Sequence, residues 1–239
     1  MGFSINLSPC VDVNNNPHNP VIGVRAFGSD PAQVRDLGIA YIKGLQESVI
    51  ATAKHFPGHG DTAVDSHLGL PVIHHSKERL DNVELVPFKG AIAEGVEAIL
   101  ASHVVFPALE PVPGRPASLS YPVLTRLLRE ELGYDGLILT DCMEMQAVTR
   151  QFSMAEAAVL AVEAGNDLLL VSHTPEFQIE AFWAVVNGVR EGRISEERID
   201  ESLARIARAK RTYVKWPFPQ TKVGSGENIE IMEEAYGDS

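Results

Sequence analysis

The sequence predicts an α/β fold in which helices cover a parallel β-sheet. Short β-rich runs, most of them apolar throughout, occur at residues 5–11, 49–53, 98–101, 136–140 and 167–171. A longer segment with helical spacing of apolar residues follows each run, and strands that are apolar throughout require cover on both faces. The pattern fits both a doubly wound sheet and a β/α barrel, because both repeat this unit and gather polar loops at the carboxyl ends of the strands.

Signals at the ends of the helical segments support this division of the chain. The first helix is expected to begin after Ser29 or Asp30, either of which can cap it, with Pro31 in its first position. A capping box from Ser153 to Glu156 opens a later helix that is expected to end near Gly165. The other helices are expected from about Lys77, around Leu124, from Thr174 and from about Ser195. The apolar face predicted for the first helix consists of Val34, Leu37, Tyr41 and Leu45.

The composition argues against nucleic-acid and membrane partners. The 239 residues include 20 Lys and Arg against 32 Asp and Glu, a formal charge of -12, so a phosphate backbone would find no basic surface. No stretch approaches the ~20 apolar residues of a membrane span, and MGFSINLSPC at residues 1–10 has neither the basic start nor the apolar core expected of a signal peptide. As written, the chain is expected to be cytoplasmic, with export of a longer parent protein left open. Cys10 and Cys142 are expected to be buried free thiols.

The densest polar feature is the segment KHFPGHGDTAVDSH at residues 54–67, which follows an apolar run. One interpretation is a solvated connection with glycine turns. A second is a metal site, but the spacing matches no zinc pattern, and no metal or cofactor is expected. The ligands of such a site would be His55, His59, Asp61, Asp65 and His67. The third is a dyad in which Asp65 orients His67 for general acid/base chemistry near neutral pH.

A second carboxylate, Asp141, follows the apolar run of GLILTDCMEM. An isolated aspartate at a strand end often only caps a turn. Parallel-sheet enzymes, however, place catalytic groups at the carboxyl ends of strands, and the apolar run would partly desolvate this carboxylate. Together with an acid/base on another loop, Asp141 suggests double displacement at an anomeric carbon.

Four segments, at residues 9–31, 54–67, 116–136 and 139–145, resemble the catalytic barrel of glycoside hydrolase family 3, specifically its bacterial β-N-acetylglucosaminidases. The resemblance implies a (β/α)8 TIM-type barrel that lacks its N-terminal part, with about five β/α units present. Residues 1–219 would form this partial catalytic barrel. Residues 220–239 would form an acidic, mostly disordered tail.

The resemblance also implies an activity: retaining exo-hydrolysis of terminal β-linked N-acetylglucosamine from peptidoglycan- or chitin-derived oligosaccharides. In that scheme Asp141 is the nucleophile, and His67, held by Asp65, is the general acid/base. The residues that would bind the sugar hydroxyls are Arg25, Lys54 and His55. The alternatives are an inactive remnant or split enzyme whose partner chain supplies the missing strands, a glycoside phosphorylase, and a metal-dependent hydrolase. His103 fits core packing, a loop hydrogen bond or substrate contact equally well.

Overall fold

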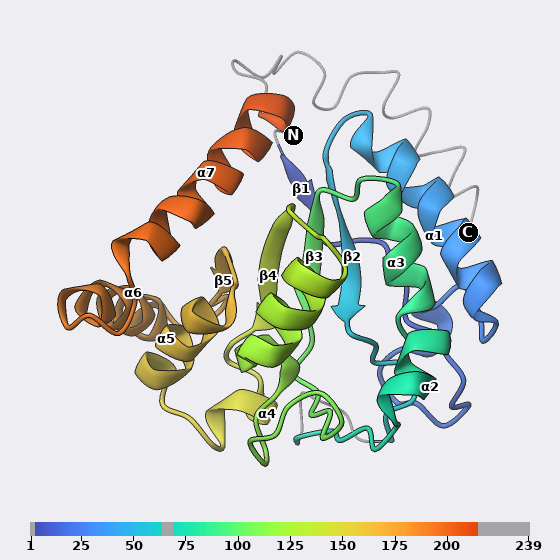
Figure 1. Ribbon diagram of the computed structural model, residues 1–239, viewed down its shortest axis with the longest axis horizontal. Coiled ribbons are helices and arrows are strands. Elements are labelled where there is room, and N and C mark those ends of the chain that lie inside the picture. The colour runs from blue at the N-terminus through green and yellow to red at the C-terminus, as the bar shows by residue number, and fades with distance from the viewer. Residues whose placement is uncertain (1–2, 64–68, 215–239) are drawn as a thin grey trace, which may run out of the picture.

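A computed structural model describes residues 3–63 and 69–214, and its centre is a single parallel sheet (Figure 1). The strands are β1 (Ile5–Asn6), β2 (Ile50–Phe56), β3 (Ala98–Ala101), β4 (Leu137–Cys142) and β5 (Leu168–Leu170). Their order in space is their order in sequence, and each pairs in parallel with the next. A doubly wound sheet reverses its order at a switch point, so this sequential order selects the barrel-type alternative. The expected partial β/α barrel of about five units is confirmed.

The helical elements connect and cover the strands. They are η1 (Gly23–Arg25), α1 (Pro31–Gln46), α2 (Lys77–Asn82), α3 (Val86–Ala93), η2 (Ala117–Leu119), the π-helical η3 (Pro122–Glu131), α4 (Gln146–Thr149), α5 (Met154–Ala164), α6 (Pro175–Arg190) and α7 (Glu196–Tyr213). Three predicted starts are confirmed by side-chain caps. Asp30 accepts a hydrogen bond from the N–H of Ala32, and Ser153 accepts one from the N–H of Glu156. Ser195 caps α7 in the same way.

The face predicted for α1 is correct for Val34 and Leu45, which pack in the core, and wrong for the other two residues. Leu37 and Tyr41 are each 44% exposed, whereas the buried residues of this helix are Val34, Gly38 and Ile42. Gly38 explains the difference, because a Cβ at this position would lie 2.8 Å from Cγ1 of Val11. The missing side chain lets the helix approach the buried chain after β1, which turns the stripe at i, i+4 and i+8 inward.

The helix expected from Lys77 is also different, because it consists of two helices. α2 ends at Asn82, and α3 begins at Val86 with Pro87 in its first turn. The break suits Pro87, whose ring fits the first turn of a helix but not its interior.

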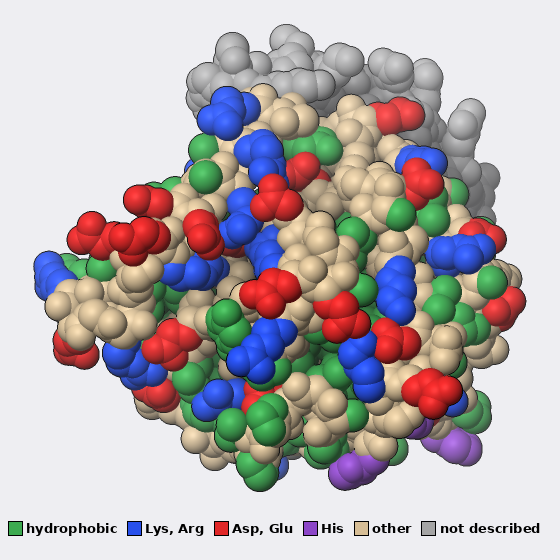
Figure 2. All heavy atoms as spheres, in the orientation of Figure 1, with side chains coloured by type: hydrophobic (Ala, Val, Ile, Leu, Met, Phe, Trp, Pro, Cys, Tyr) green, Lys and Arg blue, Asp and Glu red, His purple; other side chains and the backbone are tan. Residues whose placement is uncertain are grey.

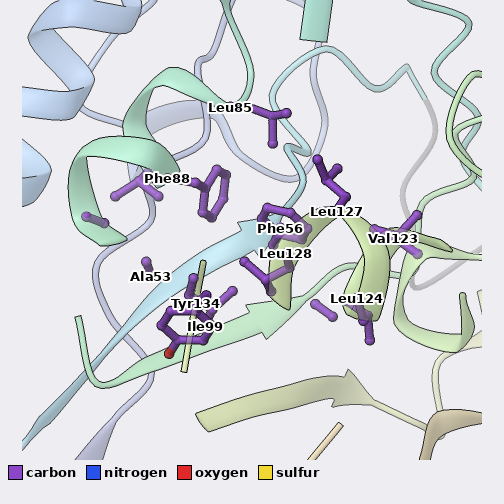
Figure 3. Close-up of a cluster of buried hydrophobic side chains, with 14 of the residues drawn as sticks. Ala53, Phe56, Leu85, Phe88, Ile99, Val123, Leu124, Leu127, Leu128 and Tyr134 are labelled. Atoms are coloured by element: carbon purple, nitrogen blue, oxygen red, sulfur yellow. The ribbon is translucent and has the colours of Figure 1, made fainter. Parts of the chain in front are cut away.

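The core lies on both faces of the sheet. On one face the alternate strand residues Ala53 and Ile99 pack beneath the helices, where Phe56 and Phe88 meet edge to face at 5.2 Å (Figure 3). On the other face Leu100 and Leu137 belong to a second cluster. The residues of that cluster from α7 are Ile206, Ala209 and Tyr213. Side chains that follow Leu100 and Leu137 at even spacing therefore share a face away from α1 and α3.

Three further expectations concern membrane-spanning helices, the two cysteines and the C-terminal tail. Within the described ranges, no helix is long and apolar enough to cross a membrane. Cys10 and Cys142 are both free, as expected, but Cys142 is half-buried rather than buried. The expected tail at residues 220–239 lies outside the described residues.

Two glycines of α1 give a matched test of the packing that orients this helix. A Cβ on Gly44 would meet nothing within 4 Å, so Gly44→Ala should stabilise the chain by about 0.5–1 kcal/mol through lower backbone entropy of the unfolded state. Gly38→Ala gains the same propensity but overpacks against Val11, and it should destabilise by about 1–2 kcal/mol net. Urea unfolding of both variants measures the two changes. Equal stabilisation by both would contradict the close approach at Gly38.

Candidate functional site

The candidate site lies on the carboxyl side of the sheet, on the face that carries Leu100. Lys54 pairs in register with Leu100, which pairs with Leu139, and Asp141 lies two residues further along β4. The even spacing places Lys54 and Asp141 on the same face. A cavity of about 130 Å³ opens there. Its lining consists of Leu7, Val21, Arg25, Lys54, His55, His59, Leu100 and Asp141.

The strands reach further into the site than the sequence suggested. β2 runs to Phe56 and β4 to Cys142, so Lys54, His55 and Asp141 are strand residues rather than loop residues. A strand holds its side chains more rigidly than a loop does. On the visible face, histidine colour appears in separate patches at the lower rim, the side toward which β2 ends (Figure 2).

Asp141 has the environment of an ionised carboxylate. It is half-buried, and its Oδ1 accepts a hydrogen bond from the N–H of Cys142 at 2.8 Å. Burial raises the pKa of the Asp141 carboxyl, but His55, His103, the Cys142 N–H and Lys54 lower it, and the lowering dominates. An ionised carboxylate at this position suits a nucleophile at neutral pH.

Two cations flank the cavity. Burial and the charge of Arg25 lower the pKa of the Lys54 ammonium, while Cys10, Asp141 and Asp12 oppose that shift. The guanidinium of Arg25 donates from Nη1 to the carbonyl of Val21 at 3.3 Å, and its Nη2 lies 3.3 Å from Nε2 of His55. The sugar-binding residues expected from the sequence, Arg25, Lys54 and His55, therefore lie around one cavity with Asp141.

The sequence interpretation missed a buried carboxylate, Asp12, beneath this cavity. Its side chain is fully buried, and its Oδ1 accepts a hydrogen bond from the N–H of His59 at 2.6 Å. Its Oδ2 lies 2.6 Å from Nδ1 of His55 and accepts from Sγ of Cys10 at 3.2 Å. Although burial raises the pKa of Asp12, His55 and His59 lower it to about 2. The available signal was a charged residue inside the apolar run CVDV.

His103 contacts the strand end beside Asp141. It is buried, its Nδ1 lies 2.6 Å from Oγ of Ser118, and its Nε2 lies 3.0 Å from the carbonyl oxygen of Cys142. A carbonyl can only accept, so Nε2 donates and Nδ1 accepts from the hydroxyl. Burial lowers the pKa of this imidazole, which agrees with a neutral ring. Of the three readings left open for His103, the hydrogen bond is the one observed.

The ligands of the metal alternative are dispersed among other partners. Asp61 pairs with Nε2 of His75 at 2.5 Å, and Nδ1 of His59 lies 2.8 Å from Oγ1 of Thr62. Burial and His55 lower the pKa of His59 to about 4. The remaining expected ligands, Asp65 and His67, lie outside the described residues.

Another group of side chains could hold a metal ion. Cys10, Asp12 and His55 offer ligand atoms that all lie within 4.8 Å of one another. The same atoms hydrogen-bond to one another, so a metal ion would have to displace the protons of Cys10 and His55.

The low pKa of Asp12 predicts a pH-dependent contribution to folding. A carboxyl whose folded pKa is depressed stabilises the fold above its ordinary pKa of 3.8, and this contribution is lost as the pH falls toward about 2. Asp12→Asn should therefore lower the free energy of unfolding by about 2 kcal/mol at pH 7, and the difference from the unaltered chain should shrink below about pH 4. Urea unfolding across this range measures it.

Asp36, an exposed carboxylate paired with Arg35, supplies the control for that measurement. Asp36→Asn should leave stability nearly unchanged, because exposed ion pairs contribute little. A loss in Asp12→Asn that stays constant from pH 7 to pH 2 would show that packing, and not charge, accounts for it.

Comparison with known proteins identifies the family. The model of the glycosyl hydrolase family 3 N-terminal domain matches residues 1–209. Beta-hexosaminidase A of Pseudoalteromonas piscicida is 36% identical over 227 residues, which cover 88% of this chain and 38% of that protein.

Solved structures agree with the sequence relatives. The family 3 β-N-acetylglucosaminidase of Paenibacillus sp. FPU-7 superposes with a TM-score of 0.89 at 48% identity, covering 98% of this chain and 45% of that one. A beta-glucoside phosphorylase, BglX, superposes with a TM-score of 0.86 at 28% identity, covering 98% and 44%. The chain thus spans less than half the length of these three proteins. With the family model matching most of its length, the chain belongs to glycoside hydrolase family 3, in the part that forms the N-terminal domain.

Proposed function

We propose that the chain carries the active site of a retaining exo-β-N-acetylglucosaminidase. The substrates would be peptidoglycan- or chitin-derived oligosaccharides with a terminal β-linked N-acetylglucosamine. The observation that carries the proposal is the ionised Asp141, which lies in one cavity with Arg25, Lys54 and His55. The similarity to a β-hexosaminidase and to a β-N-acetylglucosaminidase supports the choice of sugar.

The reaction would proceed by double displacement. Asp141 attacks the anomeric carbon, the glycosidic C–O bond breaks, and His67 gives its proton to the leaving oxygen. His67 then takes a proton from water, the water oxygen attacks the anomeric carbon, and the bond to Asp141 breaks. Asp65 would orient His67 throughout. Residues 1–219 would form the catalytic part of the chain.

Substrate would be held by the charged donors around the cavity. Arg25 and Lys54 can each donate hydrogen bonds to sugar hydroxyls, and charge-assisted bonds are the stronger kind. His55 lines the same cavity. These contacts would keep the anomeric carbon within reach of the Asp141 carboxylate, which is the main requirement for displacement.

The nucleophile is tested by release of nitrophenol from aryl β-N-acetylglucosaminide. Asp141→Asn should lower kcat at least about 10³-fold, because the amide cannot form the glycosyl intermediate. Asp135→Asn is a matched control on the same chain segment. Asp135 precedes β4, at the other end of that strand, where its carboxylate pairs with Arg208. Retained turnover in Asp141→Asn would overturn the mechanism.

His67 is tested by the dependence of the rate on the leaving group. His67→Gln should slow hydrolysis of a β-linked N-acetylglucosamine disaccharide by about 10²–10⁴-fold, because the sugar oxygen leaves poorly without a proton. Release of nitrophenolate should suffer less in the first displacement, since this leaving group needs no proton. Burst kinetics with the aryl substrate would separate the two steps. Equal slowing of the first step for both substrates would exclude His67 as the acid.

A phosphorylase is the second candidate, and a specific observation favours it. The BglX neighbour is a β-glucoside phosphorylase, and the cations Arg25 and Lys54 could meet an anionic acceptor. Assays in phosphate should then yield N-acetylglucosamine 1-phosphate instead of the free sugar. A chelator added to the same assays tests the metal-dependent alternative, which requires that activity be lost.

A partner chain that supplies further barrel strands is supported by the sheet edges. Within the described ranges, β1 and β5 each pair with one neighbour. An apolar cavity of about 400 Å³ lies beside β5 and between α6 and α7, and Phe182 at its wall is 61% exposed. A paired strand and its helix would cover both features. Absence of turnover by the chain alone, in any buffer, would support this alternative or an inactive remnant.

A further inference from the structure

We propose that Asp12 is a positioning residue, which fixes the tautomer of His55 and through it the placement of Arg25 at the cavity. The functional part of this inference rests on the proposed glycosidase activity. The tautomer itself does not, because it follows from the hydrogen bonds of the folded chain.

The carboxylate of Asp12 is a fixed acceptor. Its Oδ1 accepts from the N–H of His59 at 2.6 Å, and both oxygens lie 3.2 Å from the N–H of His55. Oδ2 also accepts from Cys10. The side chain has no exposed surface, so water cannot replace any of these donors. Asp12 therefore joins the backbone at both ends of the segment from His55 to His59 and cannot turn away from it.

The geometry of His55 allows one arrangement of its ring proton. Nδ1 lies 2.6 Å from Oδ2 of Asp12, which only accepts, so Nδ1 must carry the proton. Nε2 lies 3.3 Å from Nη2 of Arg25, and a guanidinium only donates. Nε2 must then be the acceptor. A proton on Nε2 would set two donors against each other at Arg25, so the contacts select the tautomer with Nδ1–H.

Arg25 depends on this acceptor for its position. The residue is exposed, and its other hydrogen bond within the described residues goes to the carbonyl of its near neighbour Val21. The contact with His55 is the one that holds the guanidinium against β2 and the cavity. If the proton moved to Nε2, donor would face donor and the guanidinium would be pushed from the wall. The hydrogen bonds between Asp12 and His55 and between His55 and Arg25 thus let a buried carboxylate position a sugar-binding group.

The same two hydrogen bonds give His55 a positioning role and not a proton-transfer role. Nδ1–H is held by a carboxylate below the cavity, and the Nε2 lone pair is occupied by a permanently charged donor. His55 therefore has no labile proton to offer beside Asp141. The acid/base of the proposed reaction must be another group, which agrees with the assignment of His67.

The tautomer is tested by long-range ¹H–¹⁵N spectra of the chain labelled with ¹⁵N-histidine, in which His55→Gln identifies the His55 signals. The unaltered chain should show Nδ1–H and a bare Nε2 at neutral pH. Asp12→Asn should lose this preference. Arg25→Ala should keep it, because Asp12 and not Arg25 holds the proton. Asp61→Asn is the matched control, which should alter His75 alone.

Three results would overturn the tautomer. They are Nε2–H in the unaltered chain, an unchanged His55 in Asp12→Asn, and a changed tautomer in Arg25→Ala. If Asp12→Asn does not fold, the unaltered chain and Arg25→Ala still decide, since Arg25 is exposed and its loss leaves the core intact.

The positioning role is tested by a double-mutant cycle on the aryl glycosidase activity. Asp12→Asn and Arg25→Ala should each lower kcat/KM about 10- to 100-fold, and the double variant should be little worse than Arg25→Ala alone, because both act through one contact. Additive losses would reduce Asp12 to a structural role. Without turnover in the unaltered chain the proposed function fails, and the spectra still decide the tautomer.

Discussion

The alternation of side chains along the parallel strands is the constraint on which both the core and the site depend. In β2, Ala51 and Ala53 point toward the helices, so Lys54 must point to the other face. In β4, Ile138 belongs to the helix-covered core, and Asp141 follows Leu139 on the opposite face. A shift of one residue in either strand would bury a charge under the helices. The packing of small and branched apolar residues therefore fixes the strand register that brings Lys54 and Asp141 to one cavity.

Two buried carboxylates show how the fold separates stability from chemistry. Asp167, at the amino end of β5, accepts from Arg129, Ser202 and the N–H of Ile138, so guanidinium charge compensates it directly. Asp12, on the carboxyl side, has N–H, thiol and imidazole donors as its direct partners among the described residues. A guanidinium partner neutralises the charge of a buried carboxylate directly. A carboxylate that is held by hydrogen-bond donors keeps its negative charge, which can then orient a neighbouring side chain such as His55. The second arrangement suits a site that must orient Arg25 through His55.

The sequence predicted the elements better than their contacts. Proline and aspartate at positions 31 and 30, and the capping box at Ser153, locate helix starts because these signals are local. The buried stripe of α1 depends on Val11 meeting Gly38, a contact between distant segments that spacing cannot reveal. Lys54 and His55 looked like loop residues because polar side chains usually end a strand. Asp12 escaped notice because it directly follows the predicted run at residues 5–11, and no spacing pattern links it to the segment at residues 54–67.

The charge of the site suits the proposed choice of a histidine, and not a second carboxylic acid, as the acid/base. The chain as a whole is acidic, with a formal charge of -12, yet Arg25 and Lys54 give the cavity a locally positive wall. His55, His103, the N–H of Cys142 and Lys54 together lower the pKa of Asp141 despite its burial. A second carboxylic acid would have to remain protonated beside these cations, which favour its ionised form. A histidine avoids the conflict, because its basic form is neutral and its acidic form is attracted to Asp141.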